Sequence, residues 1–338
     1  MSELLFPSLQ AGNLDPDSQQ WRQAIFDWLG NINAAQTRRA YTQAWRDFMQ
    51  ATNVSHPLEI SRSHLIAYKE YLSTQLSPRT GRPYSQMTIN QRLSAISSFF
   101  AYALQLGLVE VNPVDGVTRK NVNPYGRATH LDIEKKEHLL FLDQIDTDTL
   151  QGKRDLAMML IFLTTGVRVS VVANAYLGDI EQRGSEWVLV YQQKGGETDA
   201  ARITSIMPAV MDYLAARGVS LEDAHLPLFG ATPRGKLIME KTGHGAVEEK
   251  SLTSTTINNL VRKYARRASL DGITAHSLRH TAAMHASQKG TTAEVSKFLR
   301  HKSIRVTTIY LEHVDIESAD RLTNDLANDL MQDPRVGL

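Results

Sequence analysis

The first part of the chain carries apolar residues at helical spacing. One helix with a single buried face is predicted by four apolar residues at i, i+4, i+7 and i+8, namely Tyr41, Trp45, Phe48 and Met49. A second helix is predicted after the capping residue Ser61, with Leu65, Tyr68 and Leu72 buried. A third begins after Ser85 and ends at Gly107, and its buried positions are Ile89, Leu93, Ile96, Phe100 and Leu104.

The pattern changes after these helices. Residues 121–130 (NVNPYGRATH) lack apolar periodicity and contain Gly, Asn and Pro, which is typical of an interdomain linker. The apolar run Leu156–Leu163 predicts a buried helix that Gly166 ends. Two β-prone runs, Trp187–Tyr191 and Arg202–Met207, flank a glycine-containing turn and predict a β-hairpin.

The carboxy-terminal part is mostly helical in its pattern. Residues 230–251 are expected to form a long polar loop. Helices are then predicted at 253–268, 276–289 and 291–300. The pattern of the tail at 315–331 predicts an amphipathic helix with an acidic outer face. The expected fold class is therefore mainly α with a small β-hairpin, in two domains.

Composition excludes several kinds of protein. The chain has 338 residues and no cysteine, so a disulfide scaffold, a thiolate zinc site and a cysteine nucleophile are all excluded. No apolar run approaches the ~18–20 residues that span a bilayer, and the start of the chain lacks the pattern of a secretion signal. We therefore expect a cytoplasmic protein with no membrane partner.

A formal net charge of +1 conceals an uneven distribution of charge. Residues 22–108 hold nine basic and four acidic residues, and residues 251–311 hold ten basic and two acidic ones. Acidic segments at 131–148 and 312–338 offset these two blocks. Solvated helix faces would give similar counts, but two separate basic blocks favour a polyanionic partner.

Four segments carry candidate chemistry. They are TTGVR ending at Arg168, the hairpin Lys194, HSLRH at 276–280, and the run from His301 to Tyr310. Each segment is a weak signal by itself. His276 and His280 are spaced to share one helix face and bind a metal, but no third ligand is evident.

Together the four segments resemble the tyrosine recombinase (phage integrase) family of the Xer/Cre type. The shared features are an arginine after a TG turn, a lysine in the next hairpin, H-x-L-R-H, a histidine flanked by basic residues, and a tyrosine nine residues later. The segment TINQRLSAISSFFAYA also resembles the core-binding domain of that family. The resemblance implies a C-shaped clamp. Its parts are an all-helical, SAM-like core-binding domain at 1–120, a linker at 121–130 and a mostly helical catalytic domain at 131–338.

The resemblance implies how a scissile phosphate would be held. Arg168 and Arg279 would clamp it, because the planar guanidinium donates two hydrogen bonds and stays ionised. Negative charge that builds on the non-bridging oxygens would be stabilised there, as in an oxyanion hole. His276 and His301 would bond the phosphate or manage the proton of the nucleophile.

The resemblance also implies a nucleophile and an acid. Tyr310 would attack phosphorus and form a 3′-phosphotyrosyl intermediate, and Lys194 would protonate the leaving 5′ oxygen. The covalent intermediate conserves the bond energy, so strand exchange through a Holliday junction and religation would need no ATP. Two arginines and a lysine supply positive charge that a metal would otherwise provide, so no cofactor or metal is implied.

The partner implied by the resemblance is double-stranded DNA with paired recombination half-sites. A homodimer would form on each site and a homotetramer in the synaptic complex, linked by the 315–331 helix docking on a neighbouring protomer. The setting would be the nucleoid of a prokaryotic cell. Candidate DNA contacts in the two basic blocks are Arg38, Arg39, Gln91, Arg92, Asn258, Arg262 and Lys263.

Two positions depart from the family pattern. Val171 stands where the family usually carries an acid that supports neighbouring active-site groups. Arg300 stands where glycine usually precedes the histidine, and it would add a phosphate contact or have no effect. Val171 leaves open a catalytically weakened DNA-binding regulator of the same fold. A telomere resolvase or a type IB topoisomerase, which share the chemistry, are further alternatives.

Overall fold

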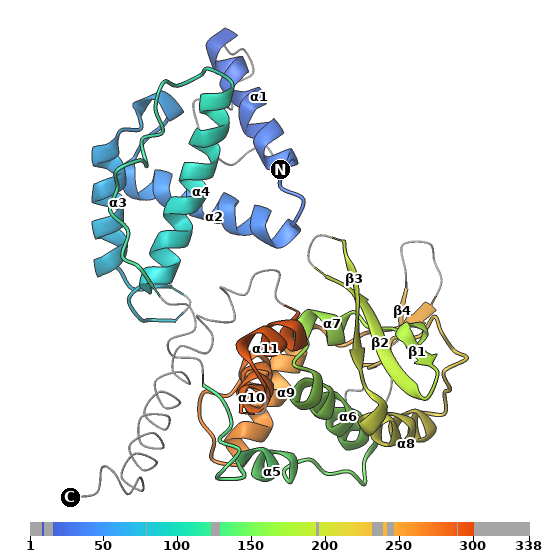
Figure 1. Cartoon of the computed structure of the whole chain (residues 1–338). Coiled ribbons are helices and arrows are strands. Elements are labelled where there is room, and N and C mark those ends of the chain that lie inside the picture. The colour runs from blue at the N-terminus through green and yellow to red at the C-terminus, as the bar shows by residue number, and fades with distance from the viewer. Residues whose placement is uncertain are drawn as a thin grey trace, which may run out of the picture. The chain divides into compact units, whose positions relative to one another are not determined.

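The chain forms two compact units, Met1–Pro124 and Tyr125–Leu338, and each is described by itself (Figure 1). Within the part of the chain described by this computed structural model, no helix has both the length and the apolar character to cross a membrane. The described residues are 9, 16–78, 80–122, 129–193, 196–231, 239–241, 247–288 and 290–300.

The first unit is built from helices. They are α1 (Pro16–Gly30), α2 (Ala35–Thr52), the short 3-10 helix η2 (Pro57–Glu59), α3 (Arg62–Thr74) and α4 (Gln86–Gln105). The side chains of Ser61 and Ser85 accept hydrogen bonds from the backbone N–H groups of His64 and Thr88, so both predicted caps are confirmed. The three predicted helices correspond to α2, α3 and α4.

Helix α1 is absent from the elements predicted above. Its buried residues Trp21, Ala24 and Trp28 follow helical spacing, so the signal was present in the sequence. The indole ring of Trp28 stacks on Tyr41 of α2 with a centroid separation of 6.0 Å. One predicted core position is wrong, because Leu104 lies in the last turn of α4 and is 42% exposed.

The second unit contains seven α-helices in its described residues. They are α5 (Glu137–Leu142), α6 (Leu150–Thr165), α7 (Val169–Ala173), α8 (Met207–Arg217), α9 (Ser254–Arg267), α10 (Ala275–Ser287) and α11 (Thr292–Leu299). Helix α6 is the buried helix predicted from its apolar run, and it packs against α8 and α10. Gly166 ends it in a left-handed conformation with φ of 60°, as its position predicts.

The second unit also holds a three-stranded antiparallel sheet (Figure 1). Its strands are β1 (Ile180–Arg183), β2 (Glu186–Gln192) and β3 (Thr198–Arg202), in that order. The predicted hairpin is therefore confirmed, but its second strand begins earlier than predicted, with Asp199 opposite Tyr191. The residues after β3 leave the sheet and form the 3-10 helix η4 (Thr204–Ile206).

The segment at 230–251 is more regular than the polar loop predicted above. Strands β4 (Met239–Lys241) and β5 (Val247–Glu249) pair antiparallel inside it. Phe229 and Leu252 flank the segment and are buried in the core of the second unit. The predicted tail helix at 315–331 lies outside the described residues, as does most of the predicted linker.

Candidate active site

The turn between α6 and α7 presents Arg168. Gly166 and Val167 are buried, whereas Arg168 is exposed at the N-cap of α7. The turn packs closely against α11, because a Cβ atom placed on Gly166 would lie 3.0 Å from the Leu299 side chain. No residue of the described chain makes a hydrogen bond or ion pair with the Arg168 guanidinium, so its donors are available to an anion.

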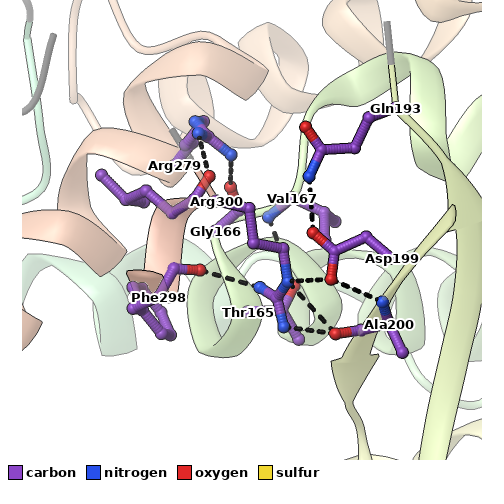
Figure 2. Close-up of polar contacts among 10 residues, drawn as sticks. Thr165, Gly166, Val167, Gln193, Asp199, Ala200, Arg279, Phe298 and Arg300 are labelled. Carbon is purple, nitrogen blue, oxygen red and sulfur yellow. Dashed lines mark hydrogen bonds and ion pairs between the residues drawn. The ribbon is translucent and has the colours of Figure 1, made fainter. Parts of the chain in front are cut away.

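Arg279 joins this turn to two helices. It lies on α10, and its side chain is buried, with the residue 5% exposed. Its Nη1 donates to the carbonyl oxygen of Gly166 (Figure 2). Its Nη2 donates to the carbonyl oxygen of Leu299 at 2.8 Å. Two main-chain acceptors therefore fix the guanidinium plane close to the turn that carries Arg168.

His276 lies one helical turn before Arg279, near the start of α10. Loss of ring hydration lowers the pKa of His276 below its ordinary value, and the positive charges of Arg279 and Arg168 lower it further. Burial raises the pKa of the nearby Tyr191 on β2, while the positive charge of Arg300 opposes this shift. Arg168 and Arg279 thus form a cationic pair suited to a phosphate, and both act electrostatically on the His276 ring.

The His276 titration gives a first prediction. In the free protein its midpoint should fall below 6.5, and it should rise when DNA places a phosphate beside the ring. The folded state then binds this proton less tightly than the unfolded chain, so stability should decrease as pH falls below the ordinary value. NMR titration of the His276 ring signals, assigned with His276→Gln, measures both midpoints. A midpoint at or above 6.5 without DNA would contradict the prediction.

Three of the six predicted catalytic residues come together in the described structure, namely Arg168, His276 and Arg279. The other three, Lys194, His301 and Tyr310, lie outside the described residues. For two of them, Lys194 and His301, the preceding residue is described. Gln193 follows β2 and precedes Lys194, while Arg300 ends α11 and precedes His301.

The two departures from the family pattern have different surroundings. Val171 lies on α7 and packs partly buried against the core of the second unit. Arg300 points to the sheet, where its Nε lies 3.1 Å from Asp199 Oδ1 and 3.1 Å from the carbonyl oxygen of Ala200. Sequence reasoning did not identify Asp199 or Ala200, and the separation of about a hundred residues gives no periodic signal for the contact.

His280 has a buried position on α10. Its ring packs edge-on against His130 at a centroid separation of 5.2 Å. Among the residues that the structure describes, no three histidine, cysteine, aspartate or glutamate side chains gather as a metal site would require.

Three of the candidate DNA contacts already have partners inside their own unit. Arg38 donates to the carbonyl oxygen of Ile32, and Asn258 accepts from the backbone N–H of Ala275 at 3.2 Å. Arg92 forms an ion pair with Asp47, and its side chain is 13% exposed. These side chains are fixed in place. The other four are exposed and lie on α2, α4 and α9, namely Arg39, Gln91, Arg262 and Lys263.

Known sequences match most of the chain. The model of the phage integrase family matches residues 132–316, and that of the phage integrase N-terminal SAM-like domain matches residues 30–109. A curated relative is the tyrosine recombinase XerC of Herpetosiphon aurantiacus. It is 27% identical over 275 residues, covering 81% of this chain and 82% of the relative.

Solved structures share the fold at low identity. The XerH site-specific recombinase bound to a palindromic difH substrate is 16% identical, with a TM-score of 0.64 over 95% of this chain and 91% of that one. A lambda integrase dimer bound to a COC′ core site is also 16% identical, with a TM-score of 0.63 over 86% of this chain and 94% of that one. Since the family model matches more than half of its residues, the chain belongs to the phage integrase family.

Proposed function

We propose that this chain is a site-specific DNA recombinase that breaks and rejoins DNA through a tyrosine nucleophile. The observation that carries the proposal is the cationic pair of Arg168 and Arg279, with the His276 ring beside it. The fixed guanidinium of Arg279 and the available one of Arg168 suit the two non-bridging oxygens of a phosphodiester. The family membership and the recombinase relatives support the same reaction.

In the proposed cleavage step, the Tyr310 hydroxyl oxygen attacks phosphorus. The tyrosine O–P bond forms and the P–O5′ bond breaks, leaving a 3′-phosphotyrosyl bond and a free 5′ hydroxyl. Lys194 supplies the proton that the leaving 5′ oxygen takes up, and His301 helps to hold the phosphate or to manage the tyrosine proton. Arg168 and Arg279 stabilise the charge that builds on the phosphate oxygens.

Strand exchange reverses this chemistry. The 5′ hydroxyl of a second strand attacks the phosphotyrosyl bond, releasing Tyr310 and joining the strands through a Holliday junction without ATP. No metal or cofactor is needed, because the two arginines and Lys194 carry the positive charge. We place the reaction in the cytoplasm of a prokaryotic cell, where its DNA substrate lies.

The proposed substrate is duplex DNA with paired half-sites. The exposed side chains Arg39, Gln91, Arg262 and Lys263 are the proposed contacts, while Arg38, Arg92 and Asn258 would act mainly by shaping the contact surfaces. A homodimer on each site and a homotetramer in the synaptic complex complete the proposal.

A nicked suicide substrate tests the function. DNA that the protein retains is first selected from a random-sequence library, and a nick is placed beside the cleavage position so that the cut strand diffuses away. We expect a covalent protein–DNA adduct on a denaturing gel, unchanged by EDTA. DNA binding without any adduct would instead favour the regulator, and an adduct blocked by EDTA would contradict the metal-free step.

Removal of the tail tests the assembly. A chain that ends at Asp315 should still bind a single half-site but lose cooperative binding to paired half-sites, because the acidic amphipathic segment at 315–331 would no longer link protomers. Gel-shift titrations on one and two half-sites measure the difference. Unchanged cooperativity after the truncation would contradict the prediction.

A further inference from the structure

Arg300 takes a backbone conformation that does not favour arginine. It caps α11 in the left-handed region, with φ of 53° and ψ of 48°. A residue with a Cβ atom pays about 1–2 kcal/mol in this region, and glycine avoids most of that cost. Glycine is also what the resembling family usually carries here. The backbone conformation therefore disfavours arginine at this position, and any benefit of the residue must come from the contacts of its side chain.

The Arg300 guanidinium is engaged at all three nitrogens. Nε contacts Asp199 Oδ1 and the carbonyl oxygen of Ala200, both at 3.1 Å, and Nη2 donates to the same carbonyl oxygen. Nη1 donates to the carbonyl oxygen of Phe298 at 2.7 Å. The side chains of Arg300 and Asp199 are 21% and 26% exposed. This ion pair is therefore better shielded from solvent than an ordinary surface pair.

Asp199 carries the contact onward to the hairpin turn. Its Oδ2 accepts a hydrogen bond from Gln193 Nε2 at 2.5 Å, so Arg300, Asp199 and Gln193 form a continuous row (Figure 2). The backbone N–H of Gln193 donates to the carbonyl oxygen of Glu197 at 2.7 Å, which closes the base of the turn. Lys194 follows Gln193 directly in the sequence.

The end of α11 is also bonded to Arg279, one of the two arginines that the proposed function assigns to the phosphate. Arg279 donates to the carbonyl oxygen of Leu299, the residue before Arg300. Two consecutive residues, 299 and 300, thus connect Arg279 on one side and the base of the lysine hairpin on the other. His301 is the next residue in the chain.

We propose that Arg300 and Asp199 are positioning residues that hold the Lys194 hairpin in register with Arg279 and the His301 segment. This inference rests on the proposed function, since it assigns the two residues to delivery of the Lys194 proton. They touch neither the phosphate nor the nucleophile and act through Lys194. The hydrogen bonds of Arg300, Asp199 and Gln193 would hold the base of the hairpin in one conformation. Less conformational entropy would then be lost when Lys194 reaches the leaving oxygen in the cleavage step.

Arg300→Gly and Asp199→Asn test the proposal. Arg300→Gly installs the residue that the backbone favours, so a loss of activity cannot come from new strain at this turn. Adduct formation on the nicked phosphate substrate should fall by about 10–100-fold, a part of the loss caused by Lys194→Ala. On a substrate with sulfur in place of the bridging 5′ oxygen, the leaving thiolate needs no proton. All three variants should therefore approach the rate of the unmodified chain.

Arg202→Gln is the matched control. It removes an ion pair with Glu186 on the same sheet, where the two side chains are 69% and 40% exposed, and it should leave cleavage unchanged on both substrates. Two results would overturn the proposal. One is normal cleavage of the phosphate substrate by Arg300→Gly, and the other is an equal loss on both substrates, which would indicate a general structural role.

Hydrogen exchange tests the same contacts without relying on activity. In Arg300→Gly the amides of Gln193 and Gly196 should exchange faster by about 10-fold, while those of the β1–β2 ladder stay unchanged. Unchanged exchange at the turn would overturn the proposed positioning. If the unmodified chain forms no adduct at all, the proposed function fails, and the exchange result still decides whether Arg300 orders the hairpin.

Discussion

Tyr310→Phe should abolish the covalent protein–DNA adduct while leaving DNA binding intact. The substitution removes only the oxygen that would attack phosphorus, and loss of a nucleophile lowers cleavage by at least about 10⁴-fold. The arginine pair that would hold the phosphate is untouched, so retention of the nicked substrate on a native gel should match that of the unmodified chain. Adduct formation is read on a denaturing gel with a labelled DNA strand.

Tyr191→Phe is a matched control for this prediction. Tyr191 lies near Arg168, Arg279 and Arg300, and burial raises the pKa of its hydroxyl, which makes it a poor source of a phenolate. This variant should therefore keep the adduct. An adduct that survives in Tyr310→Phe and disappears in Tyr191→Phe would identify Tyr191 as the nucleophile and contradict the proposed role of Tyr310.

Arg168→Gln and Arg279→Gln should both lower cleavage by about 10²–10³-fold, because each removes a guanidinium that the proposed function assigns to the phosphate. Their effects on stability should differ. Arg168 is exposed, so its loss should change the free energy of unfolding by less than about 0.5 kcal/mol. Loss of Arg279 deprives the carbonyl oxygens of Gly166 and Leu299 of a buried charged donor, which should cost about 2–4 kcal/mol.

Thermal unfolding monitored by circular dichroism separates the two variants, and single-turnover adduct formation measures their cleavage. Arg279→Lys is a useful companion, since it keeps the charge but cannot reach both carbonyl oxygens as a planar fork does. Equal stability of the two glutamine variants would mean that the Arg279 contacts contribute little to folding. Full cleavage activity in either variant would show that the substituted arginine does not bind the phosphate.

Local signals in the sequence predicted much of the fold. The apolar run and glycine of α6, and the serine caps of α3 and α4, act within a few residues of one another. Strand β3 was harder to predict, because Asp199 and Ala200 have poor β-propensity. Their place in the sheet depends on pairing with β2 and on Arg300, which lies a hundred residues away.

The candidate site was predictable only in part. Residue types in a known order pointed to Arg168, His276 and Arg279, which the structure brings together. Residue type alone did not show which polar side chains are held in ion pairs or hydrogen bonds within their own unit. Arg92 carries the same charge as Arg39, yet only Arg92 is paired with Asp47, because α2 and α4 pack side by side at that point.

The contacts that build the site also fix when it can exist during synthesis. Arg279 bonds to Gly166 across 113 residues of sequence, and Arg300 bonds to Asp199 across 101. Contacts of such long sequence separation form late in folding, and here they require nearly all of the second unit to have left the ribosome. A nascent chain shorter than about 300 residues lacks Arg300 and the proposed nucleophile, so cleavage competence would arise only after residue 310 has been added.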